Sequence, residues 1–155
     1  MVYAMKLADK GRYAPPPQLG PSAQSVAETV ARWPGVQARA HWLLGDERRT
    51  DGTDFYFVEE ELGHIHLDSV AHVIFPRPIV DMLIEARLGR RFQLSDEVVA
   101  FEIRNQSAAA HAVWLFQLSY DLLNAPNACD ISARITSYLT GSSQTSDGSA
   151  ARSRG

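Results

Sequence analysis

The chain has 155 residues, of which 45% are hydrophobic and 21% charged, a composition typical of a single soluble globular domain. A net charge of −3 offers no basic surface for nucleic acid or an anionic membrane, and no apolar run approaches the roughly 20 residues that span a bilayer. The single cysteine, Cys129, cannot form an internal disulfide, and the N-terminus lacks the apolar segment of a secretory signal, so we expect a cytoplasmic protein.

Proline residues mark the first segment of the chain. Pro15-Pro16-Pro17 and Gly20-Pro21 block regular structure, so residues 1–21 are expected to form an extended, Pro-rich arm. At the other end, Ser, Gly and Ala dominate residues 141–155, which predicts a disordered tail. A single domain is therefore expected over residues 22–140.

Between these ends, hydrophobic periods and turn residues predict one helix, four strands, a helix, a strand and two helices, in that order. The expected elements are a helix at 22–33, strands at 36–44 and 54–58 separated by a polar turn at 45–52, a hairpin at 60–76, a helix at 79–88, a strand at 97–104, and helices at 107–123 and 131–139. Consecutive strands favour an antiparallel sheet, so we expect the α+β class, with about five strands and the helices packed on one face. The other face would be partly open, which suits a small ligand.

The predicted hairpin Glu60–Pro76 holds three of the five histidines. Side chains alternate along a strand, which places Leu62, His64 and His66 on one face of its first strand. His72, on the second strand, joins that face if the turn keeps the register. Imidazole changes its charge near neutral pH, so the hairpin is the candidate site for acid–base chemistry.

Five short motifs follow one another in the order found in a known family. They are Trp33-Pro34-Gly35-Val36, Glu61-Leu62-Gly63-His64-Ile65-His66, Phe75-Pro76-Arg77, Phe101-Glu102-Ile103-Arg104 and Leu115-Phe116-Gln117-Leu118-Ser119-Tyr120. Over residues 27–123 the chain therefore resembles the luciferase-domain family, a small α+β domain that also occurs in fungal luciferase and in many uncharacterised bacterial proteins.

The resemblance implies an enzyme that acts on an aromatic or polyketide-like small molecule. Fungal luciferase adds molecular oxygen to an electron-rich hydroxypyrone without a flavin or a metal, so no cofactor and no metal are expected here. The chain also departs from the family: many bacterial members carry a His-His pair after the helix that follows Phe-Pro-Arg, whereas residues 86–96 contain no histidine.

With this resemblance, His64 and His66 are the expected catalytic residues. One of them would act as general base and generate an enolate for oxygenation, cyclisation or rearrangement, a setting that suits natural-product biosynthesis. The side chains expected to contact the substrate are those of His72, Phe55, Phe57, Arg77, Arg104 and Tyr120. The two remaining histidines, His41 and His111, are expected on a strand surface and a helix surface.

Three alternatives use the same residues. The H-x-H pair, with His72 opposite and Glu60 or Asp68 nearby, has donors for zinc or non-haem iron. A non-catalytic module could instead use the histidines to shape a pocket for a hydrophobic ligand. An accessory protein would use the Pro-rich arm and the open sheet face for a partner or for a homodimer.

Overall fold

The computed structural model describes residues 5–43 and 46–147. Its elements in chain order are η1 (Leu7–Asp9), α1 (Pro21–Ala31), β1 (Val36–Leu43), β2 (Asp46–Phe57), β3 (Glu60–His66), β4 (Val70–Ile74), α2 (Arg77–Glu85), β5 (Arg90–Phe92), β6 (Ser95–Glu102), α3 (Gln106–Asn124), η2 (Pro126–Ala128) and α4 (Ile131–Asp147). The strands form one antiparallel sheet in the order β1-β2-β3-β4-β6-β5. The predicted α+β class is confirmed, with six strands where about five were expected.

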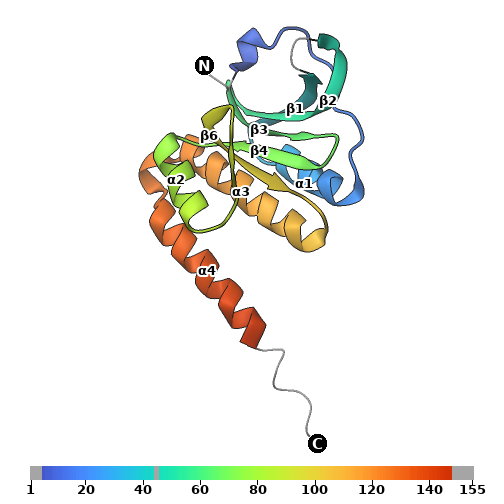
Figure 1. The fold of residues 1–155 in the computed structure, drawn as a ribbon. Coiled ribbons are helices and arrows are strands. Elements are labelled where there is room, and N and C mark those ends of the chain that lie inside the picture. Colours follow the sequence, from blue (N-terminus) through green and yellow to red (C-terminus); the bar gives the residue numbers. More distant parts are fainter. Residues whose placement is uncertain (1–4, 44–45, 148–155) are drawn as a thin grey trace, which may run out of the picture.

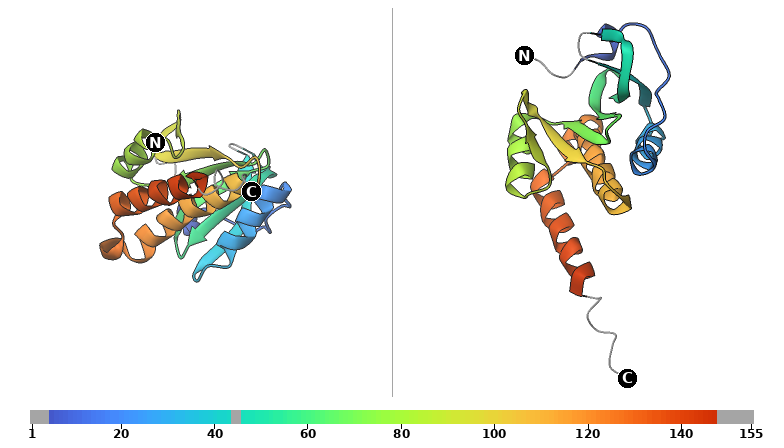
Figure 2. Two further views of the ribbon diagram at one scale, coloured as in Figure 1. Left: turned by 90° about the horizontal axis from the view of Figure 1, so that it is seen from below. Right: turned by 45° about the vertical axis from the view of Figure 1, so that its right-hand side comes forward.

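The helices α1, α2 and α3 cover one face of this sheet, as predicted (Figure 1). On the other side, the N-terminal arm runs past β1 and β3, where Leu7 N–H donates to Glu59 O and Ala40 N–H donates to Ala14 O. The helix α4 contacts α2 and then projects away from the domain (Figure 2). No helix of the described residues is both long and apolar enough to cross a membrane.

The hydrophobic core lies between the sheet and α3. Alternate side chains of the strands meet an apolar stripe of the helix, because residues three and four apart share one face of a helix. The fully buried members of this contact are Phe55, Leu62, Ile65, Val73, Leu115, Phe116 and Leu118. Asn105 caps the start of α3 by accepting a hydrogen bond from Ala108 N–H at 2.9 Å.

Three predicted elements differ from the structure. The polar segment at 46–52 is not a turn but the first part of β2, where the side chains of Arg48 and Arg49 are exposed. The pair Arg90-Arg91, which follows the helix predicted at 79–88, lies in the short edge strand β5. Finally, α4 continues to Asp147, so residues 141–147 are helical where a disordered tail was predicted, and the rest of that tail lies outside the described residues.

A β-bulge in β3 corrects the predicted facing of Leu62. The pair Phe55↔Gly63 is followed by Tyr56↔Glu61, so Leu62 is an additional residue in the ladder. Gly63 adopts φ of 148°, a backbone conformation that glycine permits. As a result Leu62 faces the helices, whereas Glu61 and His64 share the opposite face.

We expect Gly63→Ala to destabilise the protein by about 2 to 5 kcal/mol. A Cβ at this position would lie 2.3 Å from His72 O and 3.0 Å from the Phe116 ring, and the positive φ would be strained. Chemical denaturation of the variant checks this value. The matched control is Gly141→Ala in α4, where a Cβ meets no atom within 4 Å and the gain in helix propensity should stabilise slightly. Equal stability of Gly63→Ala and the wild type would contradict the bulge.

Candidate active site

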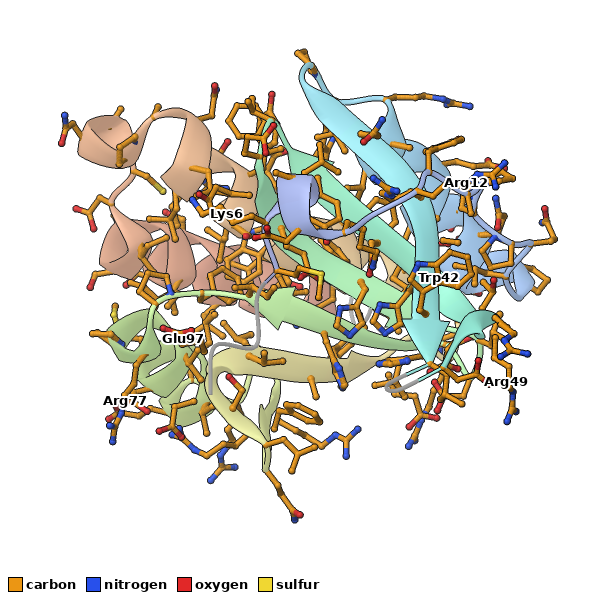
Figure 3. The ribbon with its side chains drawn as sticks, turned by 90° about the horizontal axis from the view of Figure 1, so that it is seen from above. Lys6, Arg12, Trp42, Arg49, Arg77 and Glu97 are labelled. Carbon is orange, nitrogen blue, oxygen red and sulfur yellow. The ribbon has the colours of Figure 1, made fainter. Side chains whose placement is uncertain are left out.

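Four histidines lie together on the sheet face that is turned away from the helices. Residues paired across antiparallel strands share a face, and one such row contains Asp54 on β2, His64 on β3 and His72 on β4. In the next row, His41 on β1 and His66 on β3 lie on either side of Gly52. We call His41, His64, His66 and His72 the histidine cluster. Figure 3 looks onto this face, with Trp42 of β1 labelled.

Three of these imidazoles are oriented by carboxylates through the same ring nitrogen. His41 Nδ1 lies 2.6 Å from Asp54 Oδ1. His64 Nδ1 lies 2.9 Å from Glu61 Oε1, and His66 Nδ1 lies 2.8 Å from Asp51 Oδ2. An ionised carboxylate only accepts, so each Nδ1–H donates and each Nε2 keeps its lone pair.

The Nε2 atoms of His64 and His66 point toward the same nitrogen of His72. His72 Nδ1 lies 3.2 Å from His64 Nε2 and 3.2 Å from His66 Nε2. The His41 ring stacks on the His64 ring at 4.0 Å between centroids, and it meets the His66 ring edge-on at 5.0 Å. One ring nitrogen from each of His41, His64 and His66 lies within 4.8 Å of the other two, so these three residues have the geometry to hold a metal ion.

The N-terminal arm closes one side of the cluster with a charge. Lys10 Nζ forms an ion pair with Asp54, the carboxylate that orients His41, and both side chains are buried. Met5 N–H donates to Glu61 Oε2 at 3.3 Å. Lys10 also lines a pocket of about 450 Å³ together with Trp42 and the arm residues 11–15. The arm therefore both supports the carboxylates and borders open space next to the cluster.

Burial sets the protonation of the cluster. Together with the neighbouring imidazoles, whose effect is smaller, it lowers the pKa of His41 to about 2 and that of His72 to about 3. The pKa of His64 is well below its usual value for the same reasons. Burial has the opposite effect on a carboxylic acid and raises the pKa of Glu61 to about 7. At neutral pH these three imidazoles are therefore uncharged.

These shifts predict that the protein loses stability in mild acid. Below the ordinary histidine pKa the unfolded chain binds protons that His41, His64 and His72 refuse in the folded state, so stability falls as the pH falls; Glu61, whose folded pKa is raised, partly offsets this loss. We expect the free energy of unfolding to decrease by about 2 kcal/mol between about pH 6 and about pH 5. Urea denaturation at the two pH values measures it.

His72→Gln is the matched comparison, because it removes one of the groups that titrate. The variant should lose about 1 kcal/mol less than the wild type over the same pH interval. Stability that is unchanged between the two pH values in the wild type would contradict neutral, buried imidazoles.

The structure brings together His64, His66 and His72 of the predicted site residues. It places the other five elsewhere. Phe55 and Phe57 face the helices, where Phe55 meets Phe116 and Phe57 meets Tyr120 at ring distances of 5.3 and 5.0 Å. The hydroxyl of Tyr120 donates to Pro34 O at 2.7 Å.

The two predicted arginines are exposed and lie in ion pairs. Arg77 lies 3.8 Å from Asp96, and Arg104 lies 2.8 Å from Glu102. Figure 3 places Arg77 far across the molecule from Trp42, which borders the cluster. Neither arginine contacts a histidine of the cluster.

Several residues of the site were not expected from the sequence. His41 was interpreted as a surface residue, and Asp51, Asp54 and Glu61 were not interpreted as partners of histidines. Of the aromatic strand it is Tyr56 that shares the face of the cluster, with the Lys10 ammonium 6.0 Å from its ring centroid. A signal for Asp54 existed: alternation along the strand places it opposite the buried Phe55.

The segment that departs from the family pattern also contributes to the site. Phe92 of β5 lies against His72, with 4.4 Å between ring centroids. Residues 86–96, which lack the His-His pair of many bacterial family members, thus supply an aromatic ring beside the cluster.

The fifth histidine lies outside the cluster. His111 Nε2–H donates to Leu88 O at 2.7 Å, and the Tyr138 hydroxyl lies 2.6 Å from His111 Nδ1. These bonds join α3 to α4 and to the end of α2, so His111 holds the helices together.

Comparison with known proteins gives one match. Residues 59–119 match the family model described as Luciferase domain, which confirms the resemblance expected from the sequence. No curated protein and no solved structure matches the chain significantly. The matched segment contains Glu61, His64, His66 and His72, whereas His41 and the carboxylates of β2 precede it.

Proposed function

We propose that this luciferase-domain protein is an enzyme that removes the proton from an acidic hydroxyl or enol of an aromatic or polyketide-like small molecule, at the histidine cluster. The observation that carries the proposal is the pairing of His66 Nδ1 with Asp51 at 2.8 Å, which holds a partly exposed imidazole in the tautomer of a base. A base held in one tautomer by a carboxylate is a common arrangement for proton transfer.

His66 is a better base than His64, the other residue expected to act. The His66 side chain is 19% exposed, whereas that of His64 is 2% exposed and stacks under His41. Of the two, His66 is therefore the residue that lies nearer to solvent. His64 instead packs against the ring of His41 and contacts His72.

The surroundings of His66 suit an aromatic substrate that becomes negatively charged. His72 and Phe92 present adjacent rings on the same side, and rings favour offset or edge-to-face contact with an aromatic ligand. The row that contains His72 continues through Ala100 to the exposed Arg90 on β5. The guanidinium of Arg90 is a donor that could bind an enolate or carboxylate oxygen.

Ionisation of the substrate is the first step of several reactions. The resemblance to fungal luciferase favours oxygen addition to the enolate; cyclisation or another rearrangement of the enol would begin in the same way.

The low pKa of His41 and His72 favours a second candidate, a non-catalytic module that binds a hydrophobic small molecule, because such imidazoles are weak bases. A cytosolic location and a homodimer also stay predictions.

The test compares His66→Ala and Asp51→Asn with the exposed control Arg104→Gln. A panel of 4-hydroxy-2-pyrones and polyhydroxylated aromatics is followed by oxygen consumption and by mass spectrometry of products. We expect turnover to fall by about 10² to 10⁴-fold in His66→Ala and by a smaller factor in Asp51→Asn, because the base is removed or loses its orientation. Melting temperatures should be nearly unchanged, since both side chains are partly exposed.

Undiminished turnover in His66→Ala would exclude this residue as the base. If a panel compound binds to the wild-type protein, binds more weakly to His66→Ala and is never converted, the binding module is the correct function.

A further inference from the structure

We infer that His41, His64 and His66 form a binding site for one divalent transition-metal ion of the zinc type, with His72 Nδ1 as an adjacent nitrogen. The inference rests on the proposed function for its substrate, and it changes the group that ionises this substrate. Imidazole nitrogens are suitable ligands for zinc, copper, iron and nickel.

The orientation of the rings is the first argument. A histidine that binds a metal almost always donates its other ring N–H to a carboxylate, a carbonyl or water. All three of these histidines do so, to Asp54, Glu61 and Asp51 at 2.6, 2.9 and 2.8 Å. One such pair is common in proteins, whereas three such pairs on histidines with ring nitrogens within 4.8 Å of one another are the arrangement of a metal centre.

The spacing of the nitrogens is the second argument. Zinc–nitrogen bonds of about 2.05 Å in a tetrahedron place neighbouring ligand nitrogens about 3.3 Å apart. His72 Nδ1 lies 3.2 Å from both His64 Nε2 and His66 Nε2, and the ligand atoms of His41, His64 and His66 lie within 4.8 Å of one another. To surround one ion, the His41 ring has to turn out of its stack on the His64 ring.

The hydrogen atoms at the centre give the third argument. With Glu61 and Asp51 ionised, His64 Nε2 and His66 Nε2 are both acceptors, and both are directed at His72 Nδ1. One N–H can serve only one of these two lone pairs. A cation at the same place is attracted by both.

The charges behind the rings give the fourth argument. Asp51, Asp54 and Glu61 all lie on the outer side of the cluster, and in the described part of the chain Lys10 is the one lysine or arginine that forms an ion pair with any of them. A divalent cation among the neutral imidazoles would balance these carboxylates at short range. The carboxylates also make the imidazoles stronger ligands.

Three protein nitrogens leave a coordination position open, as in catalytic zinc sites. A substrate hydroxyl bound there is acidified by the ion: its O–H bond breaks, the oxygen remains on the ion, and the proton leaves to solvent. His66 is then a ligand, and the metal ionises the substrate in its place.

The test measures metal binding without any substrate. The full-length protein is stripped with a chelator and titrated with Co²⁺ and with Zn²⁺, with visible absorption and calorimetry as readouts. We expect one ion per chain and a tetrahedral or five-coordinate Co²⁺ spectrum. Asp51→Asn should weaken binding by about 10 to 100-fold, because it disturbs only the partner of a ligand, and His41→Ala or His66→Ala should weaken it more.

His111→Gln is the matched control, since it removes a histidine outside the cluster and should bind one ion like the wild type. Melting temperatures confirm that each variant is folded. A folded wild-type protein that takes up no stoichiometric ion overturns the inference, as does unchanged binding in both His41→Ala and His66→Ala. Turnover by the stripped protein without metal uptake would leave the proposed function intact and reject the metal; stoichiometric metal without turnover would do the reverse.

Discussion

Three hydrogen bonds between carboxylates and imidazole Nδ1 atoms determine what this sheet face can do. They fix the tautomer of His41, His64 and His66, and the Nε2 atoms of His64 and His66 meet at His72 Nδ1. Two of the carboxylates, Asp54 and Glu61, are themselves buried. A buried carboxylate without partners would be costly, so the histidines and carboxylates stabilise one another as a unit.

The backbone makes this unit possible at two places. The bulge at Gly63 turns Leu62 toward the helices and leaves Glu61 on the same face as His64. One strand therefore supplies both an imidazole and the carboxylate that orients it. Gly52, between His41 and His66 in the ladder, carries no side chain that could separate their rings. The apolar core lies on the opposite face, against α3, and the fold therefore does not depend on the polar cluster alone.

Much of this arrangement could be predicted from the sequence, and the remainder has physical reasons. Alternation along β3 and β4 correctly placed His64, His66 and His72 on one face. The bulge could not be predicted, because a glycine in a strand pattern permits a bulge without requiring one. His41 was missed because its contacts depend on which strand pairs with β1, a long-range fact that local periodicity does not contain. The same holds for Phe92, whose place beside His72 depends on the pairing of β5 with β6.

The tautomers of the histidines test the account most directly, because both the proposed base and the proposed metal site require them. Long-range ¹H–¹⁵N spectra of the imidazoles can be recorded on metal-free protein at about pH 8, above the pKa of Glu61. The account predicts a protonated Nδ1 and a bare Nε2 in His41, His64 and His66. A proton on Nε2 of these residues would show that the carboxylates do not orient the rings, and it would contradict both proposals.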